Sequence, residues 1–212
     1  QVDDAPLVVY LSGLQPAVDD AIAATDPQRV VDAAEAADLL EADPHFWLDP
    51  LRLAAVGDQV AAALGQADPE RAADFDDGAQ RLRDTLEGID ADYAAELARC
   101  EGATLVSNHE SYGYLADRYG LEQVGIAGID PEAEPSPARV REIGQVIAAH
   151  NVGTVFYDEP TTAHFVKALA EEFDVNAVHL DPLEMQLDAE QDFVDVMRTN
   201  LVTLTQGLNC DG

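Results

Sequence analysis

The chain of 212 residues is long enough to bury a sizeable core as one domain or two small lobes, and its 47% hydrophobic content excludes a disordered protein. Its 42 acidic and 11 basic residues leave a formal net charge of -31, which makes nucleic acid and anionic membranes poor partners because both require clustered Lys and Arg. The acids are scattered and Lys167 is the only lysine, a pattern that we interpret as halophilic adaptation.

We expect neither a membrane-spanning helix nor a signal peptide within this sequence. It contains no run of about 18 apolar residues, so we expect no membrane-spanning helix. Gln1 leads directly into VDDAPLVVYLSG, which does not have the pattern of a signal peptide. We therefore expect either a cytoplasmic protein or one whose targeting segment lies outside this chain.

The first 99 residues predict a small α/β region followed by a long helix. We expect a strand at 6–13, a helix at 16–24, an acidic loop at 30–44 and a second helix at 50–66. From Asp68 to Arg99 apolar residues recur at spacings of three, four or seven, which predicts one amphipathic helix. At 1.5 Å per residue this helix is about 45 Å long, more than a compact α/β unit needs, so we expect it to connect two lobes.

The rest of the chain alternates regularly between strands and helices. The expected strands are 103–108, 123–129, 153–159 and 176–183, and the expected helices are 110–120, 137–151, 161–173 and 193–208. This order predicts an α/β fold whose parallel sheet is covered on both faces. In such sheets a ligand binds at the carboxyl ends of the strands.

Three polar residues are candidates for binding. His109 follows the strand TLVSN, Asp181 ends the strand NAVHL, and His45 precedes an aromatic pair in DPHFWLDP that would bury its ring and orient it. Each also fits a structural role: a helix start for His109, a turn for Asp181 and a buried core histidine for His45. Together, two imidazoles and a carboxylate from distant segments suit zinc or manganese.

Several other kinds of site are excluded or left open. His109-Glu110 begins like HExxH, but residue 113 is Gly, so the metalloprotease motif fails. There is no GxSxG, P-loop or GxGxxG motif, and we identify no base that would serve a hydrolase. Cys100 and Cys210 lack CxxC spacing, so from composition alone they are either two thiols or one long-range disulfide.

Five segments, in order over nearly the whole chain, carry a family resemblance. DPHFWLDP is similar to the DPHxWLDP signature of the solute-binding proteins that supply zinc or manganese to ABC transporters, the ZnuA/TroA type of cluster A-I. Four further segments resemble other elements of this family: SNHESYGYLADRYGL, GIDPEAEPSPARVREIGQVI, VFYDEPTTAHFVKALAEEF and NAVHLDPLE.

The resemblance implies two parallel-sheet α/β lobes joined by one long helix, with a metal ion in the cleft between them. We expect a partial amino-terminal lobe at 1–67, the connecting helix at 68–99 and a carboxy-terminal α/β lobe at 100–212. The family's first ligand, a His in an upstream loop, has no counterpart in this sequence. We therefore expect the amino-terminal lobe to be incomplete.

The resemblance also implies a set of metal ligands. These are His45, His109 and Asp181, with Glu184 as the alternative carboxylate. Zinc is favoured over manganese, because manganese-type members often carry Glu at the position of His109 and zinc prefers nitrogen ligands. The resemblance further favours a disulfide between the two cysteines.

These implications lead to an expected function. The protein would be a monomeric, extracellular or cell-surface zinc-binding protein, anchored to the membrane by a segment outside this chain. It would deliver its ion to the permease of an ABC transporter without catalysing a reaction. The alternatives are a metal-dependent hydrolase or chelatase that uses the same ligands, and an adhesin of similar fold.

Overall fold

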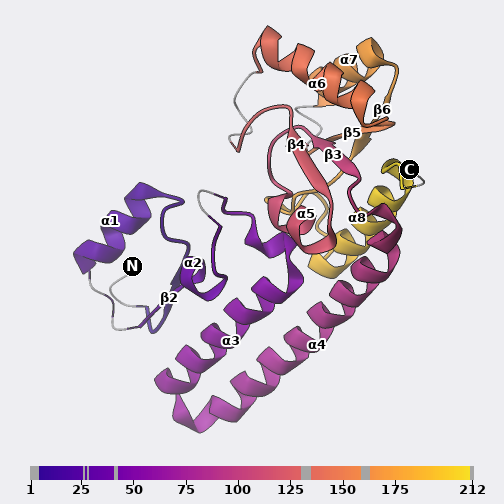
Figure 1. Ribbon diagram of the computed structural model, residues 1–212. Coiled ribbons are helices and arrows are strands. Elements are labelled where there is room, and N and C mark those ends of the chain that lie inside the picture. Colours follow the sequence, from indigo (N-terminus) through magenta and orange to yellow (C-terminus); the bar gives the residue numbers. More distant parts are fainter. Residues whose placement is uncertain are drawn as a thin grey trace. The chain divides into compact units, whose positions relative to one another are not determined.

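The computed structural model describes residues 5–25, 27, 29–40, 43–129, 135–158 and 163–210, and it has the α/β fold with parallel strands that the sequence predicts (Figure 1). Two parts of the family resemblance, 130–134 and 159–162, lie outside the described residues. The chain divides into two compact units, 1–90 and 91–212. The narrower division with a separate connecting helix at 68–99 stays a prediction.

The first unit contains a two-stranded parallel sheet. Strand β1 (Val8–Tyr10) pairs with β2 (Val30–Asp32), and helix α1 (Pro16–Thr25) connects them. The prediction of a loop throughout 30–44 was wrong at its start, where β2 is followed at once by the short helix α2 (Ala33–Ala36). The two valines of β2 are β-branched residues suited to a strand, and Asp32 accepts a hydrogen bond from the α2 backbone, so acidic residues here form a helix cap.

Two antiparallel helices follow in the first unit. The short 3-10 turn η2 (Pro69–Arg71) joins α3 (Pro50–Ala67) to α4 (Ala72–Leu97). In the part of α4 that belongs to this unit, Arg83 forms an ion pair with Asp58 of α3. This ion pair links the two helices.

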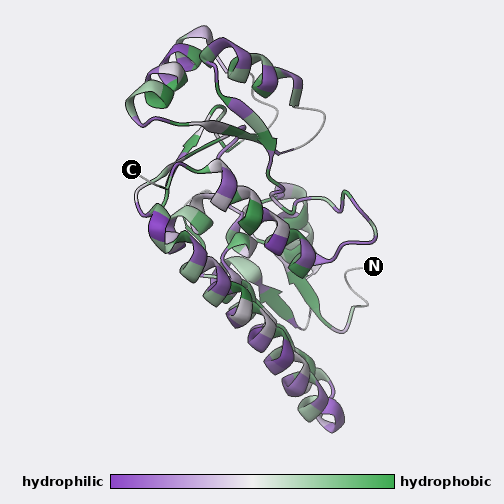
Figure 2. Cartoon of the chain, turned by 90° about the vertical axis from the view of Figure 1, so that its right-hand side faces the viewer, coloured by the Kyte–Doolittle hydropathy of each residue, from purple (hydrophilic) through white to green (hydrophobic). Residues whose placement is uncertain are grey.

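The long amphipathic helix predicted from Asp68 to Arg99 is confirmed as α4, with 26 residues and a 3-10 turn at each end, the second being η3 (Ala98–Cys100). Figure 2 shows hydrophilic and hydrophobic bands alternating along the long helices. At 1.5 Å per residue α4 is about 39 Å long. The boundary between the two compact units falls inside it, between Asp90 and Ala91.

The second unit is built on a four-stranded parallel sheet in the order β4-β3-β5-β6. Its strands are β3 (Thr104–Ser107), β4 (Glu122–Gly125), β5 (Thr154–Tyr157) and β6 (Asn176–His179). Its helices are α5 (Gly113–Tyr119), α6 (Pro137–Ala149), α7 (Ala163–Phe173) and α8 (Phe193–Gly207). The predicted alternation of strands and helices is confirmed in this unit.

Strand β4 ends four residues earlier than predicted because the chain turns sharply at Gly125. A Cβ atom at Gly125 would lie 2.4 Å from the carbonyl oxygen of Ala127 and 2.4 Å from the side chain of Glu110. The segment after the turn then bonds to the loop that follows β3, where Ala127 N donates to Asn108 O. This close approach supports the loop that carries His109.

One core cluster of the second unit lies between the sheet and helices α6 and α7. Its fully buried residues include Val106 of β3 and Val155 of β5, which pack with Ile143 of α6 and Val166 of α7. None of the helices among the described residues is long and apolar enough to cross a membrane.

Two further links join the ends of this unit. Cys100 and Cys210 form a disulfide, which confirms the pairing that the family resemblance favours. The hydroxyl of Tyr93 on α4 donates to the carbonyl of Met197 on α8 at 2.7 Å. The carboxy-terminal helix is thereby held to the segment that enters the unit.

Candidate metal site

His45 is held by a local arrangement that its own sequence motif dictates. Asp43 Oδ1 accepts a hydrogen bond from the backbone N–H of His45 at 3.0 Å and lies 2.7 Å from its ring nitrogen Nδ1. The ring of Trp47 packs edge-on against the imidazole, with centroids 5.3 Å apart. His45 is only 4% exposed, so its ring is both buried and oriented.

The second Asp-Pro step of DPHFWLDP, Asp49-Pro50, starts helix α3. Asp49 accepts hydrogen bonds from the backbone N–H groups of Leu51 and Arg52 and so caps helix α3, whose first residue is Pro50. Between the two aspartates runs a single 3-10 turn, Phe46–Leu48. The motif therefore anchors a rigid loop to the start of a helix.

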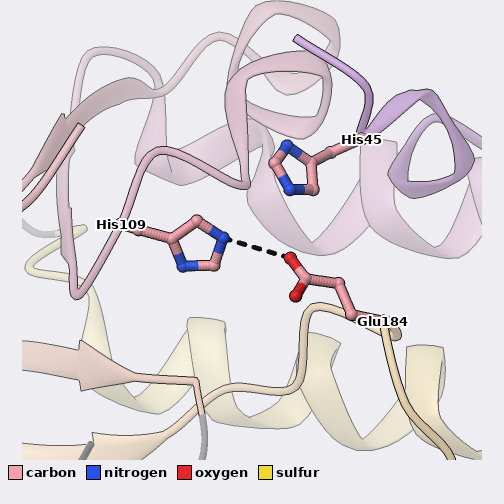
Figure 3. Close-up of side chains that lie close together, drawn as sticks. All are labelled: His45, His109 and Glu184. Carbon is pink, nitrogen blue, oxygen red and sulfur yellow. Dashed lines mark hydrogen bonds and ion pairs between the residues drawn. The ribbon is translucent and has the colours of Figure 1, made fainter. Parts of the chain in front are cut away.

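His109 lies just past the carboxyl end of β3 in the second unit, where sequence analysis expects a ligand residue. Its Nδ1 atom is 2.5 Å from Asp158 Oδ2, and its Nε2 atom is 3.1 Å from Glu184 Oε1. Figure 3 draws the candidate side chains His45, His109 and Glu184, with the His109–Glu184 contact as a dashed line. The imidazole of His109 is 1% exposed and is flanked by two carboxylates.

These carboxylates change the protonation of His109. Burial lowers the pKa of the imidazole, but the hydrogen bonds to Asp158 and Glu184 and the charges of both carboxylates raise it, and the pKa is raised to about 9. In the metal-free protein His109 is therefore a cation near neutral pH. A metal ion that binds at Nε2 must displace the proton there.

Asp181 and Glu184 lie on the turn after β6, and the backbone of this turn separates their roles. Asn200 of α8 accepts from the N–H of Asp181 and donates to its carbonyl, while Asp181 Oδ1 accepts from Leu183 N at 2.8 Å. Leu183 has a positive φ of 59°. Within this unit Glu184, the alternative carboxylate of the sequence analysis, contacts His109, and the carboxylate of Asp181 bonds to its own turn.

Asp43 and Asp158 contact the histidines, although neither is predicted from the sequence to do so. Asp158 follows β5 as His109 follows β3, so the rule that selected His109 also selects Asp158. For Asp43 the signal is an Asp two residues before a His, the spacing at which an aspartate side chain bonds to the backbone N–H of the second residue.

Two of the other histidines make structural contacts in the second unit. His150 Nδ1 lies 2.9 Å from the hydroxyl of Thr104, at the opposite end of β3 from His109. His179 Nε2 donates to the backbone carbonyl of Asp158 at 2.9 Å. His179 therefore holds the backbone of Asp158, the residue that contacts His109.

The chain is similar to known zinc-uptake and zinc-binding proteins. The family model described as "Zinc-uptake complex component A periplasmic" matches residues 1–207. The zinc-binding protein AdcA of Streptococcus pyogenes is 36% identical over 166 residues, which is 76% of this chain. The chain spans about a third of that relative's own length, 32%.

Solved structures resemble the whole described fold. The laminin-binding protein Lbp of Streptococcus pyogenes superposes with a TM-score of 0.86 at 29% identity, covering 98% of this chain and 84% of that one. The Zn(II)-bound ZnuA-like domain of Streptococcus pneumoniae AdcA superposes with a TM-score of 0.82 at 28% identity, covering 97% and 81%.

Proposed function

Because the chain belongs to the zinc-uptake complex component A family, we propose that it binds a zinc ion as cargo and delivers it to the permease of an ABC transporter. The observation that supports the proposal is the contact between His109 and Glu184, since imidazole and carboxylate groups are the types of ligand that zinc prefers. The family is one of periplasmic components, which supports a location outside the cytoplasm.

The proposed ligands are His45, His109 and one carboxylate. The two histidines share a design, because each is buried and each has its Nδ1 atom against an aspartate, which leaves Nε2 as the candidate ligand atom. The 3.1 Å contact with His109 supports Glu184 as the carboxylate. Asp181 is the alternative, because it also follows the carboxyl end of a strand of the same parallel sheet.

Zinc is favoured over manganese by the donor types. Two imidazoles and one carboxylate suit zinc, whereas manganese prefers sites richer in oxygen. A catalytic reaction is not part of the proposal, since the family is one of solute-binding transport proteins. A hydrolase would turn over simple esters or phosphates in the zinc-loaded state, and we expect no turnover.

Calorimetric titration with zinc tests the ligand set directly. We expect the wild-type chain to bind one zinc ion, and His45→Ala and His109→Ala to bind it at least 100-fold more weakly, because each removes a ligand. Glu184→Gln should weaken binding more than Asp181→Asn if Glu184 is the carboxylate.

His150→Ala is the matched control for the loss of one imidazole. His150 contacts Thr104 at the opposite end of β3, so its variant should bind zinc as the wild type does. The proposal is wrong if the wild type does not bind zinc, or if the His45 and His109 variants bind it as tightly as the His150 variant.

Delivery needs a separate measurement. Vesicles that contain the cognate permease should accumulate radioactive zinc only when the zinc-loaded chain is supplied, and the His109→Ala variant should not support uptake. Uptake that is equally fast with free zinc would contradict a role in delivery.

One observation favours a second function. The structural neighbour with a TM-score of 0.86 is the laminin-binding protein Lbp of Streptococcus pyogenes, so adhesion to laminin is the second candidate. Binding of this chain to immobilised laminin, compared between the wild type and the His109→Ala variant, tests it. Binding that is equal in both would separate adhesion from the metal site.

A further inference from the structure

The buried aspartates beside the two histidines have a role of their own. We propose that Asp158 is a positioning residue that holds His109 in the tautomer and orientation that present Nε2 to the metal, and that Asp43 does the same for His45. This inference rests on the proposed function, because it concerns how the zinc ligands are prepared for the ion.

The geometry of the Asp158–His109 pair dictates the tautomer. An ionised carboxylate has no proton to donate, so the 2.5 Å contact requires that Nδ1 of His109 carries the hydrogen and donates it. When a metal binds, the proton at Nε2 leaves and the one at Nδ1 stays. The metal then meets a ring whose lone pair points away from Asp158.

Burial shields this contact from solvent. Asp158 is 3% exposed and His109 is 1% exposed, so water does not compete for either partner. The second oxygen, Asp158 Oδ1, is buried without a hydrogen-bond partner among the described residues. Burying a carboxylate costs free energy unless it is hydrogen-bonded, and among the described residues the side-chain partner of Asp158 is His109.

The backbone around Asp158 prevents the carboxylate from moving away. His179 Nε2 donates to the carbonyl of Asp158 at 2.9 Å, and Asn108 N donates to the carbonyl of Phe156 in the adjacent strand β5 at 2.9 Å. The second bond also joins the loop of His109 directly to β5. Both partners therefore sit on one rigid edge of the sheet, which preserves their distance.

The same arrangement recurs in the first unit with a different scaffold. Asp43 Oδ1 lies 2.7 Å from His45 Nδ1, and the same oxygen accepts the backbone N–H of His45 at 3.0 Å. There the aspartate comes from the same loop, two residues earlier. Two unrelated local structures thus place an aspartate on the same ring nitrogen, which is the pattern expected if Nε2 must face a ligand in both.

The test measures zinc affinity by competition with a chelator for the wild type, Asp158→Asn and Asp158→Ala. We expect Asp158→Ala to bind zinc 10- to 100-fold more weakly, the usual loss when a partner behind a metal ligand is removed. Asp158→Asn should show a smaller loss, because its amide oxygen still accepts from Nδ1. Asp49→Asn is the control, since it removes one buried aspartate charge from a helix cap without touching a histidine.

A spectroscopic readout separates positioning from stability. In the zinc-loaded wild type, nitrogen NMR of His109 should show a protonated Nδ1 that exchanges slowly and a metal-bound Nε2. Asp158→Ala should lose the slow exchange of the Nδ1 proton, while urea unfolding of the same sample reports whether the fold is kept. If Asp158→Ala is unfolded, the smaller loss expected for Asp158→Asn is the deciding measurement.

The possible outcomes are distinguishable. If His109→Ala abolishes zinc binding but both Asp158 variants bind as tightly as Asp49→Asn, the positioning role is wrong and the proposed function stands. If the wild type does not bind zinc, the proposed function fails and the positioning role fails with it. Weaker binding together with the loss of slow exchange at Nδ1 supports the inference.

Discussion

The disulfide between Cys100 and Cys210 should be the largest single contribution to the stability of the second unit. It closes a loop with a sequence separation of 110 residues, which contains nearly the whole unit. By loop-closure entropy a cross-link of this length stabilises the folded state by about 5 kcal/mol. Because a domain is typically stable by about 5–15 kcal/mol, its loss should bring this unit close to unfolding.

The perturbation is Cys210→Ser, which breaks the bond and leaves the buried Cys100 in place. Urea unfolding should be followed by circular dichroism, because Trp47, the only tryptophan, lies in the first unit and its fluorescence would report that unit. Reduced wild type is the control and should lose the same free energy as the variant. A loss below about 1 kcal/mol in both would refute the reasoning from chain entropy.

Two further predictions concern protonation and helix packing. The pKa of His109 is raised to about 9 in the folded protein, so protonation of its imidazole should stabilise the fold by about 3 kcal/mol. This stabilisation should be complete below a pH of about 6.5 and should be lost as the pH rises through 9. Urea unfolding in EDTA should show this loss in the wild type but not in His109→Gln. Gly88→Ala, in open space on α4, should stabilise by up to about 1 kcal/mol, whereas Gly144→Ala should destabilise by about 1–3 kcal/mol because the new Cβ would lie 2.4 Å from the ring of Phe173. Thermal unfolding of both variants tests this pair, and stabilisation by Gly144→Ala would contradict the packing of α6 on α7.

Most of the fold could be predicted because its signals are local. Helix α4 shows its apolar spacing over 26 residues, and the strands of the second unit are short apolar runs between helices. The prediction of a loop at Val30–Asp32 was wrong because acidic residues follow this strand immediately. The helix cap and the short helix α2 are as acidic as a solvent-exposed loop, so the segment resembled a loop in composition. The acidic surface as a sign of halophilic adaptation stays an interpretation.

The sequence predicts the strand ends at which the candidate site lies, but it does not predict which carboxylate side chain contacts His109. The rule for parallel sheets places His109 and Asp181 at one edge, and the structure puts both there. Whether Asp181 or Glu184 reaches the imidazole depends on the clamp by Asn200 and on the positive φ of Leu183. These features come from α8 and from the backbone of one turn, and no pattern in the sequence shows them.

The contrast between His109 and Glu184 indicates how a carrier of this kind would hold its ion and still release it. The imidazole is buried and held by Asp158, so its position should change little on ion binding even though Nε2 would lose its proton. The side chain of Glu184 is 27% exposed and follows Leu183, whose backbone conformation is uncommon for a residue with a side chain. If the proposed function is correct, water should replace Glu184 before it replaces His109, so Glu184→Gln should speed zinc release in stopped-flow measurements more than it slows zinc binding.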